Sequence, residues 1–162
     1  MNKLTSIKKK MVDLEELGRH LAIWNLFDKK VVFTTGCFDI LHRGHIEYLT
    51  QAASLGDVLI VGLQSDSSVL RLKGEGKPIQ DQESRAMMVA AMSFVDAVII
   101  NEEDSPYNLI KFIQPNVLVK GADQLPKDIV GYDIVSSKGG KVLTLDIKEG
   151  LSTKALLDSI RK

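Results

Sequence analysis

The 162-residue sequence has one cysteine, Cys37, only four prolines and no long hydrophobic run. A lone cysteine cannot form a disulfide within the chain, which fits a reducing compartment, so we expect a cytoplasmic protein. No apolar run approaches the roughly 20 residues that cross a bilayer. The lysines near the N-terminus precede no apolar segment of the kind found in signal peptides. The sequence therefore predicts neither membrane insertion nor export.

Neither sign of charge is in excess, because 21 Lys and Arg residues balance 21 Asp and Glu residues. Proteins that bind nucleic acid or membrane surfaces usually carry a basic excess, so we expect neither partner. A small anionic metabolite needs only a local cluster of positive groups, so it is still a possible ligand. The chain is long enough for one domain with a substantial core.

Apolar runs alternate with amphipathic segments along the chain. Five runs predict buried strands, at residues 31–35, 58–63, 97–100, 117–119 and 142–145. Helical spacing predicts helices at residues 11–27, 46–53, 87–94, 105–114 and 152–160. The first of these helices carries an apolar stripe of Leu14, Leu17, Leu21 and Trp24, and the last carries Leu156, Leu157 and Ile160.

Three segments lack such patterns. Residues 1–10 predict a flexible, solvated tail, and residues 73–82 and 123–141, rich in glycine and polar side chains, predict loops. Alternating strands and helices are typical of a parallel sheet covered on both faces. We therefore predict a single α/β domain over residues 1–162, a Rossmann-like three-layer domain with a five-stranded parallel sheet.

Two histidines lie where the first predicted strand leads into a helix. His42 and His45 flank Gly44, and Gly36 precedes them at the end of the strand. In an open parallel sheet, ligands bind outside the carboxyl ends of the strands. A helix N-terminus there presents free N–H groups that suit a phosphate. The junction therefore predicts a phosphate-binding site.

Basic and hydroxyl side chains follow the other strands, and these groups are typical phosphate partners. They are Arg71, Lys73, Lys77, Arg85, Lys120, Ser152 and Thr153. The charged residues of the 73–82 region are equally compatible with solvated surface charges, and Ser152 and Thr153 with simple helix caps.

Neither a nucleophile–base pair nor a protein-only metal site is evident. Cys37 has no histidine partner that spacing can justify, and His42 with His45 lacks a third zinc ligand. A phosphate oxygen that attacks another phosphate is already anionic and needs no base, so such an enzyme aligns its reactants and offsets developing charge. Mg²⁺ would then arrive with the phosphates, and Asp39 or Asp123 could supply a carboxylate, although either Asp could equally stabilise a loop.

The segment 42–45, His-Arg-Gly-His, resembles the His-x-Gly-His motif of a nucleotidyltransferase superfamily. Four segments resemble the D-glycero-D-manno-heptose 1-phosphate adenylyltransferase family of ADP-heptose synthesis, over residues 36–42, 71–74, 117–121 and 150–153. The match covers about residues 28–160. It is similar to the nucleotidyl domain of the bifunctional heptose enzyme, here as a stand-alone domain without the sugar kinase.

The resemblance implies transfer of AMP from ATP, with Mg²⁺, to heptose 1-phosphate, giving ADP-heptose and pyrophosphate. It implies catalytic roles for His42, His45 and Lys73, and contacts of Lys73 and Arg85 with substrate phosphate. The implied nucleotide-binding residues are Thr35, Gly36, Cys37, Phe38, His42, His45, Lys120, Gly121, Asp123, Ser152 and Thr153. Relatives are often homodimers, and the helix that carries Trp24 is a candidate contact.

Four positions depart from the family pattern: Thr35, Ala122, Gln124 and Lys154. Two other functions stay open. A glycerol-3-phosphate cytidylyltransferase shares both histidines, but residues 147–153 lack the Arg-Thr pair that such enzymes carry before the last helix. A non-catalytic nucleotide-sensing module would keep the phosphate site without needing both histidines and Lys73.

Overall fold

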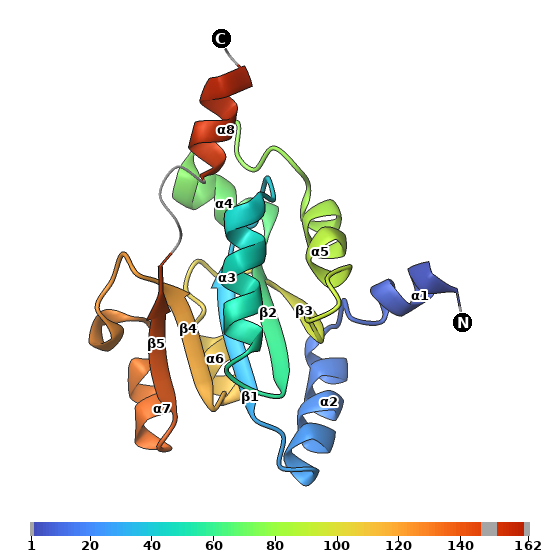
Figure 1. Ribbon diagram of the computed structural model, residues 1–162, viewed down its shortest axis with the longest axis vertical. Coiled ribbons are helices and arrows are strands. Elements are labelled where there is room, and N and C mark those ends of the chain that lie inside the picture. Colours follow the sequence, from blue (N-terminus) through green and yellow to red (C-terminus); the bar gives the residue numbers. More distant parts are fainter. Residues whose placement is uncertain (1, 147–151, 161–162) are drawn as a thin grey trace.

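The computed structural model describes residues 2–146 and 152–160. Five parallel strands form one sheet in the order β3-β2-β1-β4-β5 (Figure 1). They are β1 (Val31–Gly36), β2 (Val58–Gln64), β3 (Ala97–Asn101), β4 (Val117–Gly121) and β5 (Lys141–Leu145). The predicted five-stranded parallel sheet and Rossmann-like α/β class are confirmed, since each predicted apolar run is a strand or part of one.

Helices cover both faces of this sheet. They are α1 (Lys3–Lys8), α2 (Leu14–Leu26), α3 (Arg43–Ala53), α4 (Asp66–Lys73), α5 (Gln82–Ala90), α6 (Tyr107–Ile113), α7 (Tyr132–Ser137) and α8 (Thr153–Ile160), with a short 3₁₀ helix η1 (Pro126–Asp128). Buried side chains of α2, α6 and α7 pack on one face, and those of α3 and α5 on the other. No helix in the described parts of the chain has both the length and the apolar character needed to cross a bilayer.

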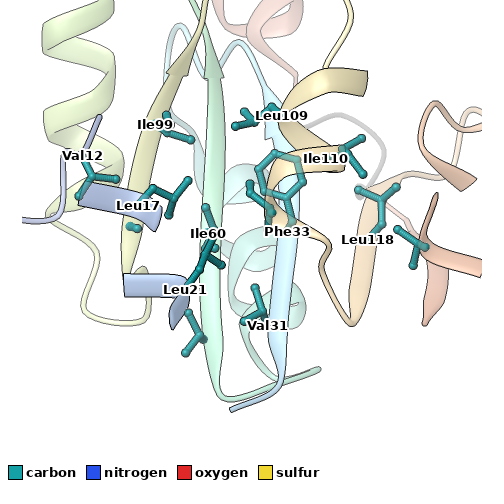
Figure 2. Packing of buried hydrophobic residues seen from close by; sticks show 14 of the residues in the cluster. Val12, Leu17, Leu21, Val31, Phe33, Ile60, Ile99, Leu109, Ile110 and Leu118 are labelled. Carbon is teal, nitrogen blue, oxygen red and sulfur yellow. The ribbon is translucent and has the colours of Figure 1, made fainter. Parts of the chain in front are cut away.

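Figure 2 shows the core on the first face, where Leu17 and Leu21 of α2 and Ile110 of α6 lie against strand residues such as Phe33 and Ile60. Trp24 packs partly against this cluster as well. The predicted apolar stripe of α2 therefore mainly serves its own domain. Leu14, expected in the same stripe, is 54 % exposed, because it stands at the first turn, beyond the edge of the core.

The predicted tail at residues 1–10 is wrong in part. Residues 3–8 form α1, and the side chain of Asn2 caps it by accepting a hydrogen bond from the Leu4 N–H. The carbonyl of Lys10 then accepts a hydrogen bond from the Val98 N–H, and the Val98 carbonyl accepts one from Val12. This pairing with the edge strand β3 orders a segment whose composition alone indicates a solvated tail.

Besides α1, three short helical segments among the described residues were not predicted. Helix α4 follows β2 directly, capped by Ser65, whose hydroxyl accepts a hydrogen bond from the Ser68 N–H. The 3₁₀ helix η1 and helix α7 lie within residues 123–141, which we predicted as a loop. Each of these segments is short and buries few apolar side chains, so periodicity gives little signal for it.

The chain order of the strands reverses at the centre of the sheet. Strand β1 pairs with β2 on one side and with β4 on the other. A reversal of this kind leaves a crevice between the loops that leave the two central strands, and ligands bind there. The segments after Gly36 and Gly121 therefore face the predicted site.

Candidate active site

A cavity of about 860 Å³ opens at this position. Its walls come from the end of β1 and the loop after it, α3, the end of α4 and the following loop, the end of β4 with the turn after it, and α8. The described lining residues are Thr35, Gly36, Cys37, Phe38, Asp39, His45, Tyr48, Lys73, Lys77, Lys120, Gly121, Asp123, Gln124, Lys154, Leu157 and Asp158. Nine of these were predicted to bind nucleotide or to act in catalysis.

The loop after β1 is shaped by one glycine and one aromatic ring. A Cβ at Gly36 would lie 2.8 Å from the ring of Phe38, closer than carbon atoms can approach, so a side chain here would displace that ring. Phe38 itself has a left-handed backbone, with φ at 49°. Its ring meets the imidazole of His45 edge-on at 5.5 Å between centroids. Gly36 and Phe38 thus set the position of His45.

Hydrogen bonds at the start of α3 orient both histidines. His42 is the N-cap residue, and its Nδ1 accepts a hydrogen bond of 3.1 Å from the Gly44 N–H. The Nδ1 of His45 accepts one of 3.3 Å from the His42 N–H. A neutral imidazole whose Nδ1 accepts must carry its proton on Nε2. Each histidine therefore keeps an Nε2–H donor for a ligand.

The charge state of these rings is set by burial and by neighbouring cations. Burial, together with the charges of His42 and Lys73, lowers the pKa of His45 to about 4. Burial also lowers the pKa of His42. The two rings lie 3.9 Å apart between centroids, so charging both would be costly. At neutral pH both act as neutral hydrogen-bond donors beside the Lys73 ammonium.

We expect the His45 imidazole to titrate with a midpoint near pH 4, well below the ordinary value of 6.5, and to stay in the Nε2–H form from pH 8 to pH 5. Two-dimensional ¹H–¹⁵N spectra of the histidine rings, assigned with His45→Gln, would measure both. Because the pKa of His45 is lower in the folded state than in the unfolded state, the contribution of this residue to the free energy of unfolding is complete above pH 6.5. That contribution falls as the pH drops from 6.5 towards 4. A midpoint at or above 6.5 would contradict this electrostatic account.

Two hydrogen bonds, one partly buried and one buried, stabilise the opposite wall. The Lys120 ammonium donates to the Thr35 hydroxyl across the β1–β4 boundary, 2.5 Å between the atoms. Burial lowers the pKa of Lys120, while Asp123 opposes that shift. The Tyr48 hydroxyl hydrogen-bonds to the Thr34 hydroxyl at 2.8 Å, and burial raises the pKa of Tyr48 to about 12. Tyr48 is thus a neutral group in the cavity wall.

Tyr48 was not predicted as a site residue. It lies three positions after His45, so both side chains share one face of α3. That spacing is the signal by which the sequence could have indicated it.

The loop that carries Lys77 is held by Asp39. Its carboxylate accepts hydrogen bonds from the Ile79 and Gln80 N–H groups at 2.8 and 2.9 Å. Asp39 therefore stabilises a loop, which was one of the two roles left open for it. Lys73 ends α4 and Lys77 follows it in this loop, so both ammonium groups reach the cavity from one side.

The prediction that Arg85 contacts substrate phosphate is wrong, because its side chain is completely buried behind the cavity wall. The guanidinium donates to the Cys37 carbonyl at 2.6 Å, the Gln80 carbonyl at 3.0 Å and the Asp66 carboxylate at 2.7 Å. These acceptors belong to three segments that surround the site. Arg85 is a positioning residue that joins the loops after β1, β2 and α4.

Ser152 and Thr153, at the start of α8, were expected to bind nucleotide. The Ser152 hydroxyl accepts a hydrogen bond from the Ala155 N–H at 3.0 Å and so caps the helix, and Ser152 is not among the described lining residues. Thr153 begins the helix, and Gly150 and Leu151 lie outside the described residues. His42 also stands behind the lining, in contact with the ring of His45.

Three residues of α8 line the cavity instead, namely Lys154, Leu157 and Asp158. The predicted inward stripe of this helix is wrong in two of its three members, since Leu156 is 39 % exposed and Ile160 is 78 % exposed. Of the three apolar residues in that stripe, Leu157 alone lines the cavity among the described residues. The spacing of apolar residues predicted that this segment is a helix, but it did not predict which side of the helix lines the cavity.

This fold and this site define a nucleotidyltransferase: neutral imidazole donors and lysines converge on a crevice at the strand-order reversal. The comparisons agree. Residues 33–149 match the family described as Cytidylyltransferase-like, and the chain belongs to that family. It is 52 % identical over 154 residues to the Bifunctional protein HldE of Campylobacter jejuni subsp. jejuni, and 51 % identical over 143 residues to that of Nitrobacter hamburgensis.

These matches cover 95 % and 88 % of the chain but 32 % and 29 % of the relatives. The chain therefore spans about a third of the length of the curated relatives it matches. Among solved structures, the lipopolysaccharide core biosynthesis protein from Thermoplasma volcanium has 31 % identity and a TM-score of 0.59, covering 74 % of this chain and 97 % of that one. Pantoate-beta-alanine ligase from Francisella tularensis, at 16 % identity, a TM-score of 0.58 and coverage of 84 % of this chain and 67 % of that one, shares the fold.

Proposed function

We propose that this chain transfers AMP from ATP to a sugar 1-phosphate, with D-glycero-D-manno-heptose 1-phosphate as the acceptor. The observation that carries the proposal is a neutral His45 with its Nε2–H donor beside Lys73 in one cavity, with the neutral ring of His42 packed against His45 from behind the lining. That set suits two phosphate-bearing reactants. The likeness to HldE over nearly the whole chain, and to a solved protein of lipopolysaccharide core biosynthesis, supports a sugar acceptor.

In the proposed reaction, an oxygen of the acceptor phosphate forms a bond to the α-phosphorus of ATP. The bond from that phosphorus to the bridging oxygen of the β-phosphate breaks, and its electron pair leaves with pyrophosphate. No proton has to be removed from the attacking oxygen. The Nε2–H of His45 would donate to an α-phosphate oxygen as negative charge grows there, and Lys73 would neutralise the phosphates.

Mg²⁺ would accompany the triphosphate, where it supplies positive charge to the phosphate oxygens. The described residues include no group of three or more His, Cys, Asp or Glu side chains placed to hold a metal by themselves. The cavity nevertheless offers two carboxylates, Asp123 and Asp158, for which the described part of the chain shows no backbone N–H donor. One or two carboxylates are what a phosphate-borne Mg²⁺ takes from a protein, so the residues fit the ion.

Pyrophosphate release tests the proposal. With Mg²⁺ present, ATP, CTP and GTP are each crossed with both anomers of heptose 1-phosphate and with glycerol 3-phosphate. We expect release only from ATP with a heptose 1-phosphate, and the active anomer identifies the acceptor. Turnover of CTP with glycerol 3-phosphate would replace the proposal with a cytidylyltransferase. Binding of ATP without release from any pair would favour a nucleotide-sensing module.

A further inference from the structure

The hydroxyl groups of Tyr48 and Thr34 form a buried pair between α3 and β1. Their oxygen atoms lie 2.8 Å apart, so one of the two hydroxyls donates its hydrogen to the other. The Thr34 side chain is completely buried and is not among the described lining residues of the cavity, whereas Tyr48, which is 5 % exposed, is one of them. The pair therefore connects the interior of the protein to the wall of the site.

The direction of this hydrogen bond follows from a count of the hydrogens. Two hydroxyl groups carry two hydrogens, and the bond between them uses one. No other residue in the described parts of the chain hydrogen-bonds to either hydroxyl. If Tyr48 donated, the Thr34 hydrogen would lack an acceptor inside the core, and a buried unpaired donor is costly. Thr34 therefore donates and Tyr48 accepts, which leaves the Tyr48 hydrogen for a partner in the cavity.

The surroundings of Tyr48 keep this donor protonated and favour an uncharged partner. Burial raises the pKa of Tyr48 to about 12, and the charge of Asp123 raises it as well. The hydroxyl therefore remains an O–H group at neutral pH. Because the charge of Asp123 opposes a second negative charge at this position, an uncharged oxygen is favoured there over a phosphate oxygen.

Both substrates of the proposed reaction carry uncharged oxygens of this kind, as the hydroxyl groups of the ribose of ATP and of the acceptor sugar. We propose that the Tyr48 hydroxyl donates a hydrogen bond to a sugar hydroxyl of a bound substrate, and that Thr34 positions the Tyr48 hydroxyl by donating to it from behind. This inference rests on the proposed function, from which it takes the two sugars. It adds a neutral contact to a site whose other assigned groups bind phosphate.

The test is a double-mutant cycle of Tyr48→Phe and Thr34→Val, with KM measured for ATP and for heptose 1-phosphate. Tyr48→Phe keeps the ring but leaves the Thr34 donor unpaired, whereas the double variant removes both hydroxyls and leaves no unpaired group. We expect the KM for one substrate to rise about 3- to 10-fold in Tyr48→Phe, the loss of one neutral hydrogen bond, and to stay raised in the double variant. The urea midpoint should fall in Tyr48→Phe and recover in the double variant. Thr34→Val alone retains the Tyr48 donor and should change either KM by less than about 2-fold.

The substrate whose KM rises identifies the sugar. If it is the ribose, the KM for ATP rises, while Tyr48→Phe binds 2′-deoxy-ATP or 3′-deoxy-ATP no more weakly than the wild type does. If it is the acceptor, the KM for heptose 1-phosphate rises instead. Tyr107→Phe is the matched control, since it removes a hydroxyl that donates to Asp133 at the surface, outside the described cavity lining.

Two results would overturn the inference while the proposed function stands. One is a rise in KM that disappears in the double variant, which would make Tyr48 a purely structural residue. The other is a KM for both substrates within about 2-fold of the wild type in Tyr48→Phe. If the wild type releases no pyrophosphate with any sugar phosphate, the proposed function itself fails. Calorimetric titration of ATP then decides on Tyr48: a Kd raised in both Tyr48→Phe and the double variant supports the contact, and an unchanged Kd refutes it.

Discussion

His45→Ala is expected to lower kcat by about 10²–10³-fold, the usual cost of removing one donor aimed at developing negative charge. The Kd for ATP should change by no more than about 3-fold, because the Nε2–H donor matters most when charge has accumulated on the α-phosphate. Rapid-quench or steady-state pyrophosphate release gives kcat, and equilibrium titration gives Kd. The effect lies in the transition state because the neutral imidazole brings no charge that would attract the ground-state triphosphate.

A structural effect must be separated from this loss. The Nδ1 of His45 accepts a hydrogen bond from the His42 N–H, so alanine also removes a capping contact that is worth about 0.5–2 kcal/mol. His45→Asn restores an acceptor and a donor on a shorter side chain and should recover part of kcat. His20→Ala, on α2 and outside the cavity, should leave both constants unchanged. A Kd for ATP that rises by the same factor as kcat falls would assign His45 to ground-state binding.

Arg85→Met is expected to give the largest loss of stability among variants at the site. It leaves the Cys37 and Gln80 carbonyls and the Asp66 carboxylate without their donors, while a methionine of similar length fills the space. We expect the free energy of unfolding to fall by about 2–4 kcal/mol, below the upper end for fully buried pairs because Asp66 is 41 % exposed. Urea denaturation would measure this, and kcat should fall as the three loops separate.

The matched control is Arg71→Met. Arg71 pairs with Asp104 at 2.8 Å, but both side chains are about half exposed, so little change in stability is expected. Arg85→Lys keeps the charge and can satisfy one or two acceptors, so it should fall between the wild type and Arg85→Met. A denaturation midpoint for Arg85→Met equal to that of the wild type would show that the three contacts contribute nothing net.

Much of the fold follows from local patterns. The five apolar runs became the five strands, because a strand buried on both faces needs a continuous apolar sequence. The histidine pair was predictable for a related reason, since the glycines and the strand-to-helix junction are local features. Helix α4 was missed because its first residues, Asp66-Ser67-Ser68, favour turns in isolation, and burial of Ser68 and Val69 against the domain adds to the Ser65 cap in stabilising the helix.

The roles of individual charges were less accessible to sequence reasoning. Lys73 and Arg85 are both basic residues near the same loop, and the sequence treats them alike. The structure separates them: one reaches the cavity, and the other is buried with three acceptors, one of them 48 residues away at Cys37. Asp39 and Asp123 divide in the same way, since only Asp39 has both oxygens bound by backbone N–H groups.

The sequence by itself determined the parallel α/β sheet and the histidine junction, because hydrophobic period, glycine placement and helix capping act over a few residues. Tertiary structure alone decided which charges line the cavity and which stabilise its walls. In the folded chain Arg85 is buried, Lys154 and Asp158 line the cavity, and Leu156 and Ile160 are exposed. The physical reason is that a side chain's partners at the site come from segments distant in sequence, which meet only once the sheet has assembled.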